Sequence, residues 1–170
     1  MKKIIFAFLL LSVGISVNAQ QQAAAPQQVT TFILVRHAEK ATDGTTDPGL
    51  TDIGKVRASA LIKLLKDTKV DAIYSTNFKR TRETVTPLSL IKNLTILPYE
   101  GTKMEEVDAM LKKFPGGTIV ICGHSNTTPS IANYLSGKVT YKDFEDTDYD
   151  NLLLVDVLVK GKAKVTWLSY

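Results

Sequence analysis

The chain has 170 residues, of which 44% are hydrophobic and 22% are charged, and its formal net charge is +4. This composition suits one domain with a buried core and excludes a disordered chain or a membrane-embedded one. The positive charge is a mild excess without a basic run, so nucleic-acid binding receives no support. The single cysteine, Cys122, excludes an intramolecular disulfide.

The first 19 residues have the features of a cleaved signal peptide. Two lysines precede the apolar run at residues 4–11, and Val17-Asn18-Ala19 offers a cleavage site that would make Gln20 the first residue of the mature protein. The apolar run falls short of the ~20 residues that cross a bilayer, which favours cleavage over the alternative of a retained membrane anchor. We therefore expect a periplasmic or secreted protein without a membrane span after cleavage.

The remaining chain divides into a low-complexity lead-in at residues 20–30, expected to be flexible, and one domain at residues 31–170. Short apolar runs predict strands at 32–35, 70–74, 95–97 and 118–122, followed by closing strands at 152–159 and 164–168. Helical patterns cover 51–66, 78–91 and 104–114, and a last helix begins at about Thr128. This alternation predicts an α/β three-layer sandwich with a largely parallel central sheet.

Three local features lead to more specific expectations. Pro87 should kink or end the second helix, and Cys122 is interpreted as a packed strand residue. In the first helix, Arg57 is expected to lie outside the buried face. The apolar side chains expected on that buried face are Ile53, Val56, Ala60, Leu61, Leu64 and Leu65.

Polar residues follow three of the predicted strands directly. They occupy residues 36–40, 75–80 and 123–126, and the only histidines of the chain, His37 and His124, lie just past two of these strand ends. In open α/β sheets, ligands bind beyond the carboxyl ends of the strands. This distribution predicts a functional site that contains both histidines.

Four motifs in these segments resemble the histidine phosphatase superfamily, branch 1. Val35-Arg36-His37-Ala38-Glu39-Lys40 is similar to the family's Arg-His-Gly signature, with alanine in place of the glycine. Leu50-Thr51-Asp52-Ile53-Gly54 resembles the family's opening of the first helix. The segment from Tyr74 to Thr84 and the motif Gly123-His124-Ser125-Asn126 are similar to those that carry its catalytic arginine and second histidine. The matches follow the family order and imply a phosphoglycerate mutase-like fold.

The resemblance implies a phosphatase in which His37 takes up the phosphoryl group and water then releases it. Arg36, Arg80 and a protonated His124 would stabilise charge on the phosphoryl oxygens. Neither a metal nor another cofactor is expected, because these cations take over that task. The implied partners are a small phosphorylated substrate or a phosphoprotein. Substrate-binding roles are assigned to Lys40, and to Asn126 with the backbone amides at its helix start.

The proton donor for an alcohol leaving group is the weakest match. Glu100, after the third strand, is the candidate, with Glu105 and Glu106 behind it. If no acid is present, substrates with good leaving groups, such as phosphohistidine, become the better expectation.

Several alternatives stay open. Arg82 competes with Arg80 for the catalytic position, Asn126 could simply cap its helix, and Glu39 with Lys40 could line the site or form a surface charge pair. A metal site of His37, His124 and Glu39 lacks the usual ligand spacing. As whole functions, a phosphoglycerate mutase-type phosphotransferase and a non-catalytic phosphate- or sugar-phosphate-binding module remain. The natural substrate and the oligomeric state cannot be derived from the sequence.

Overall fold

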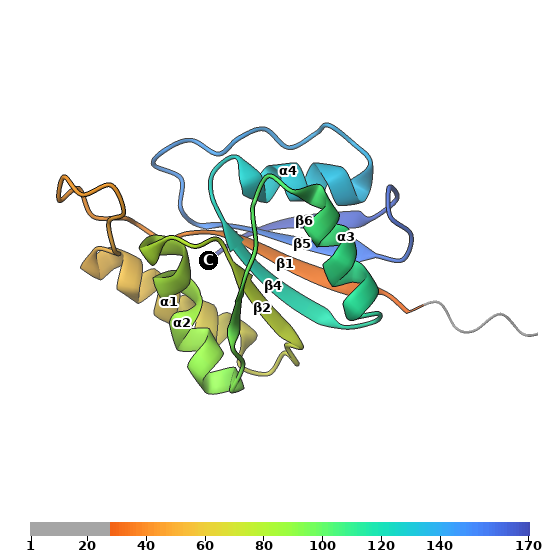
Figure 1. Ribbon diagram of the computed structural model, residues 1–170, viewed down its shortest axis with the longest axis horizontal. Helices are drawn as coiled ribbons and strands as arrows, with labels where there is room; N and C mark the ends of the chain where they lie inside the picture. The colour runs from red at the N-terminus through yellow and green to blue at the C-terminus, as the bar shows by residue number, and fades with distance from the viewer. Residues whose placement is uncertain (1–27) are drawn as a thin grey trace, which may run out of the picture.

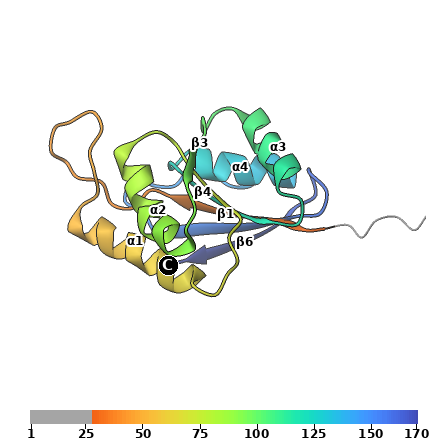
Figure 2. The same cartoon turned by 60° about the horizontal axis from the view of Figure 1, so that its bottom comes forward.

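The computed structural model describes residues 28–170, so the predicted signal peptide and most of the lead-in lie outside the described residues. A central sheet separates two helical layers, with α1 and α2 on one face and α3 and α4 on the other (Figures 1 and 2). The strands are β1 (Thr30–Arg36), β2 (Ala72–Ser75), β3 (Ile96–Pro98), β4 (Thr118–Gly123), β5 (Asn151–Val157) and β6 (Lys164–Ser169). The helices are α1 (Asp52–Leu65), α2 (Lys79–Lys92), α3 (Met104–Lys113) and α4 (Thr127–Ser136). The predicted three-layer sandwich is confirmed.

The sheet has the strand order β3-β2-β4-β1-β5-β6. The strands β3, β2, β4 and β1 pair in parallel, whereas β5 and β6 are antiparallel to their neighbours. The central strands β1 and β4 are buried along almost their whole length, which explains their unbroken apolar sequences. The sheet is therefore largely parallel, as predicted, and the carboxyl ends of β1, β2 and β4 meet at one edge.

The buried side chains form one cluster on each face of the sheet. Phe32, Leu34 and Ile131 belong to the cluster under α3 and α4, whereas Ile33 and Leu61 belong to the cluster under α1 and α2. Cys122 is fully buried in the second cluster, which confirms its interpretation as a packed strand residue. Burial also raises the pKa of its thiol.

The predicted buried face of α1 is wrong in part. Ile53 and Val56 are 68% and 71% exposed, and Leu64 is also exposed. The helix instead buries Gly54, Ala58, Leu61 and Leu65. Small residues at positions 54 and 58 let the first turns of α1 approach the segment after β1, where Ala58 packs with Ala38 and Leu50. This close approach fixes the rotation of the helix about its axis, although it leaves the larger apolar side chains of Ile53 and Val56 exposed.

Pro87 does not end α2, which runs without a break to Lys92 and ends at Asn93 in the left-handed conformation. A proline inside a helix removes one N–H donor and crowds the preceding turn. Val85 and Leu88, on either side of it, are fully buried in the core. Tertiary packing of these two side chains thus holds the helix together across the proline.

Gly54 marks a contact that allows no side chain. Thr51 caps α1 by accepting a hydrogen bond from the amide of Gly54 through its hydroxyl, while its own amide donates to the carbonyl of Glu39 (2.9 Å). A Cβ atom on Gly54 would collide with that same carbonyl oxygen of Glu39. The glycine therefore seats α1 against the backbone two residues after His37.

We predict that Gly54→Ala destabilises the protein, although alanine is intrinsically the better helix former by ~1 kcal/mol. Overpacking against a fixed backbone should outweigh that gain and lower the free energy of unfolding by about 1–3 kcal/mol. Urea unfolding measures the effect. Ser59→Ala, at an exposed position of the same helix, is the matched control and should change stability by less than ~0.5 kcal/mol. A Gly54→Ala variant as stable as this control would contradict the packing argument.

Candidate active site

The carboxyl ends of β1, β2 and β4 surround a cavity of about 380 Å³. The amide of His37 donates to the carbonyl of Gly123 (2.9 Å), which joins the ends of β1 and β4 directly. The cavity is lined by Arg36, His37, Lys40, Arg80, His124, Ser125, Asn126, Asp146 and Tyr149. The structure therefore brings together six of the seven predicted site residues, and Glu100 is the exception.

His37 is a buried, neutral imidazole in a defined tautomer. Its Nδ1 lies 2.8 Å from the carbonyl oxygen of Ala38, which can only accept a hydrogen bond, so Nδ1 carries the proton. Burial, and then the charges of Arg36 and Arg80, lower the pKa of His37 to about 3. At neutral pH its Nε2 consequently carries a free lone pair, which is the form required of a nucleophile.

His124 stands beside His37, with 5.5 Å between the ring centroids. Its Nε2 shares a hydrogen bond with the hydroxyl of Thr76 (3.0 Å), and its amide donates to the hydroxyl of Thr127 (2.9 Å). Burial, followed by the charges of Arg80 and Arg36, lowers its pKa to about 4. The expected third cation is thus neutral in the protein without an anion, and a bound phosphate would favour its protonation.

Arg36 is only 3% exposed and is held by backbone carbonyl groups of a single segment. Its Nη1 donates to the carbonyls of Glu145 (2.6 Å) and Asp148 (2.8 Å), and its Nη2 donates to that of Asp146 (3.2 Å). The Tyr149 ring lies against the guanidinium, with Cζ 4.3 Å from the ring centroid. Much of the expected phosphate-binding fork is therefore already engaged, although no described residue accepts a hydrogen bond from the buried Nε.

Arg80, rather than Arg82, reaches the cavity. Its guanidinium lies 4.5 Å from the centroid of the Phe78 ring, and it makes a long ion pair of 3.8 Å with Asp47. Its Nε is also buried without an acceptor among residues 28–170. Arg82 turns away and donates to the side chain of Asn77 (3.1 Å) in a neighbouring hollow. Arg36 and Arg80 thus both line the cavity together with His37, and each has one buried Nε–H group without an acceptor among residues 28–170.

Lys40 and Asn126 both line the cavity with exposed side chains. Asn126 precedes α4, but its side chain makes no capping hydrogen bond, so the side-chain amide is not engaged by the helix. This geometry is compatible with substrate contact by both residues and disfavours the simple capping interpretation of Asn126.

Glu39 does not line the cavity. Its carboxylate forms a close ion pair with Arg57, with Oε1 2.7 Å from Nη2 and 3.0 Å from Nε. Burial raises the pKa of this carboxyl, but the hydrogen bonds and charge of Arg57 outweigh that effect and leave the pKa below its ordinary value. Arg57 also donates to the backbone carbonyl of Tyr170 (2.6 Å). Both Glu39 and Arg57 thus hold the fold together. Arg57 is not among the buried residues of α1, as expected, but its side chain is only 22% exposed because it pairs with Glu39.

The same ion pair removes Glu39 from the alternative metal site. Within the described part of the chain, no three His, Cys, Asp or Glu side chains come together as metal ligands. His37 and His124 remain as neighbours in the cavity, but without a third ligand.

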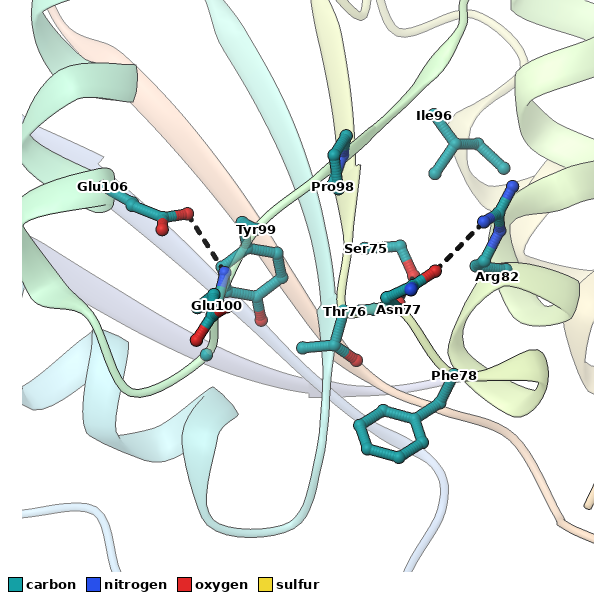
Figure 3. Close-up of a pocket in the computed structure, with 11 residues that line it drawn as sticks. Ser75, Thr76, Asn77, Phe78, Arg82, Ile96, Pro98, Tyr99, Glu100 and Glu106 are labelled. Atoms are coloured by element: carbon teal, nitrogen blue, oxygen red, sulfur yellow. Dashed lines mark hydrogen bonds between the residues drawn. The ribbon is translucent and has the colours of Figure 1, made fainter. Parts of the chain in front are cut away.

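Glu100 lies in a separate, larger hollow of about 840 Å³ beside the ends of β2 and β3 (Figure 3). Its side chain is 66% exposed, and its Oε2 lies 3.6 Å from the Nζ of Lys103. Its backbone amide donates a hydrogen bond to the carboxylate of Glu106 (3.0 Å). A smaller hollow, bordered by Thr76, His124 and Gly101, lies between this region and the His37 cavity. The predicted proton donor is thus outside the cavity that holds the nucleophile.

Sequence reasoning missed Asp146 and Tyr149, which line the cavity from the segment between α4 and β5. This segment contains neither a helix nor a strand and matches none of the recognised motifs. The cluster of acidic and tyrosine residues at 145–150 was visible in the sequence. Only the contacts with Arg36 show that this cluster returns to the strand ends.

None of the helices in residues 28–170 has the length and hydropathy that a bilayer span requires. The apolar run near the start of the chain lies outside the described residues.

Comparisons with known proteins agree with the motif analysis. Phosphoserine phosphatase 1 from Hydrogenobacter thermophilus is 33% identical to this chain, and the match covers 49% of the chain and 46% of that protein. The chain thus matches about half the length of this relative. The protein histidine phosphatase SixA with bound tungstate has the same fold, with a TM-score of 0.67, 15% identity, and coverage of 82% of this chain and 96% of the other. A phosphoserine phosphatase from Entamoeba histolytica in complex with phosphoserine has a TM-score of 0.63, 17% identity, and coverage of 81% and 95%.

Residues 32–108 match the histidine phosphatase superfamily (branch 1), and they contain three of the four motifs. The fourth motif, with His124, follows the matched region and lies beside His37 in the structure. Sequence match, fold and the order of the motifs therefore agree: over residues 32–108, a little under half of its length, the chain is similar to branch 1 of the histidine phosphatase superfamily, and its fold is that of the protein histidine phosphatase SixA.

Proposed function

We propose that this protein is a phosphatase that hydrolyses a phosphomonoester or a phosphohistidine through a phosphohistidine intermediate on His37. The observation that carries the proposal is the state of His37: a neutral ring, with Nδ1 fixed by the carbonyl of Ala38 and Nε2 free, in a cavity bordered by Arg36 and Arg80. The substrates named for the similar proteins, phosphoserine and protein phosphohistidine, fall in these two classes.

The reaction has two steps, and both use the same cationic surroundings. In the first, Nε2 of His37 attacks phosphorus and the leaving group departs. In the second, water attacks the phosphohistidine and releases phosphate. The free Nε–H groups of Arg36 and Arg80 stabilise the charge that spreads over the phosphoryl oxygens. The mechanism requires no metal, because the guanidinium groups provide the positive charge.

His37→Ala should abolish turnover of an aryl phosphate, and the native protein should yield an acid-labile, alkali-stable phosphoenzyme that the variant lacks. Release of the phenol and trapping of radiolabelled protein are the two measurements, and chelation of metals by EDTA should not alter the rate. Undiminished turnover by His37→Ala would refute the proposal. Phosphate binding by the native protein without any phosphoenzyme would instead support a non-catalytic binding module.

Arg80→Ala should lower kcat/KM for the same aryl phosphate by ~10- to 100-fold, which corresponds to the loss of a charge-assisted hydrogen bond of about 1.5–3 kcal/mol. Arg82→Ala is the matched control: it removes the same side chain two residues further along α2, where the guanidinium bonds to Asn77 outside the cavity. Its kcat/KM should stay within a few-fold of the native value. Equal losses in the two variants would show that the assignment of Arg80 to the site is wrong.

We also propose that the protein is exported and acts in the periplasm or outside the cell. The support comes from sequence alone: a basic start, a short apolar run and a cleavage site before Gln20. The protein recovered from a bacterial host should begin at Gln20, as measured by N-terminal sequencing and intact mass. A chain that keeps residues 1–19 would contradict cleavage and favour the membrane anchor.

A further inference from the structure

Among the described residues that line the His37 cavity, Asp146 is the only one with a carboxylate. We propose that this carboxyl group protonates the leaving oxygen of alcohol phosphates and later accepts a proton from the attacking water. The inference rests on the proposed function, since it assigns the acid and base for the reaction at His37. It places the proton donor on the segment between α4 and β5, away from Glu100.

The backbone of Asp146 is fixed in place on the cavity wall. Its carbonyl accepts a hydrogen bond from Nη2 of Arg36 (3.2 Å), and the carbonyls of Glu145 and Asp148 on either side accept from Nη1. The amide of Asp148 closes the turn by donating to Glu145 (3.0 Å), and the amide of Phe144 donates to Ser125 beside His124 (3.0 Å). The same guanidinium that borders the phosphoryl site therefore positions this residue.

The carboxylate of Asp146 is not committed to any other task. Within residues 28–170 it takes part in no hydrogen bond or ion pair, in contrast to Glu39, which is held by Arg57. Its side chain is exposed, so an incoming substrate can reach it. Asp146 therefore lines the same cavity as the nucleophile and has a carboxylate that no described side chain engages, which is what a general acid needs before substrate binds.

The two steps balance in atoms and charge. As the bond from Nε2 of His37 to phosphorus forms and the bond from phosphorus to the ester oxygen breaks, the carboxyl proton of Asp146 passes to that oxygen and the alcohol leaves. The resulting carboxylate then takes a proton from water as the water oxygen attacks phosphorus. Phosphate departs, His37 is neutral again, and the carboxyl group is restored for the next cycle.

Three cationic side chains, those of Arg36, Lys40 and Arg80, line the same cavity as Asp146. The neighbouring rings of His37, His124 and Tyr149 complete the set of titratable groups that line the cavity.

The test compares leaving groups rather than overall activity. Asp146→Asn, which keeps the size and the backbone bonds of the residue, should lower kcat/KM for an alkyl phosphate with a poor leaving alcohol by ~100- to 10,000-fold, the usual contribution of a general acid. For 4-nitrophenyl phosphate, whose leaving group departs without a proton, the loss should stay below about tenfold. The dependence of rate on leaving-group pKa should thus become steeper, which a merely structural defect would not cause.

Asp143→Asn is the matched control, because Asp143 is an exposed carboxylate of the same segment that does not line the cavity. It should leave both rates and their ratio unchanged. Glu100→Gln and Tyr149→Phe test the rival proton donors, and the steeper leaving-group dependence in either one, instead of in Asp146→Asn, overturns the inference. Equal loss for both substrates in Asp146→Asn overturns it too, as does a native protein that hydrolyses no alkyl phosphate. The proposed function survives these results, since it is tested separately by the activity of His37→Ala and by trapping of the phosphoenzyme.

Discussion

The buried guanidinium of Arg36 is the interaction on which the arrangement of the site depends. A charge that is almost completely removed from water is costly unless other groups replace the lost hydration. Here three backbone carbonyls between residues 145 and 148 supply the acceptors, and the Tyr149 ring covers the guanidinium. The segment between α4 and β5 is thereby joined to the end of β1. One wall of the cavity exists because this charge has to be satisfied.

Burial, reinforced by the positive charges of Arg36 and Arg80, determines the protonation state of the histidines. Desolvation and the nearby guanidinium groups hold both His37 and His124 neutral at physiological pH. The cavity is therefore positive through its arginines and nucleophilic through its imidazole, two properties that would conflict if the rings were protonated. The two buried Nε–H groups without acceptors in the described residues point to the same ligand type, because an oxyanion would satisfy both.

The residues that follow His37 are held in place by contacts with α1 and α2. Glu39 pairs with Arg57, and Gly54 lets α1 rest on the backbone of residue 39. Ala38 donates its amide to the hydroxyl of Thr84 on α2 (2.9 Å). His37 thus stands between two fixed elements, the 145–149 segment on one side and the start of α1 and α2 on the other. Such rigid support keeps a catalytic group in one orientation.

The sequence by itself determined the fold class, the parallel centre of the sheet, and the two histidines as neighbours. These conclusions follow from local information: apolar runs define buried strands, and the ends of parallel strands must meet at one edge. Motif order along the chain added the resemblance to a family and, through it, the choice of Arg80 over Arg82. None of this requires knowledge of contacts between distant segments.

Only the tertiary structure decided which way ambiguous side chains face. The rotation of α1 depended on a glycine contact with Glu39, so exposed Ile53 and Val56 could not be identified from periodicity. Glu39 turned to Arg57, and Glu100 remained in the neighbouring hollow. Asp146 entered the cavity because its backbone satisfies a charge on β1, 110 residues earlier in the chain. A sequence pattern does not predict such a contact, because the two residues come together only when the chain has folded.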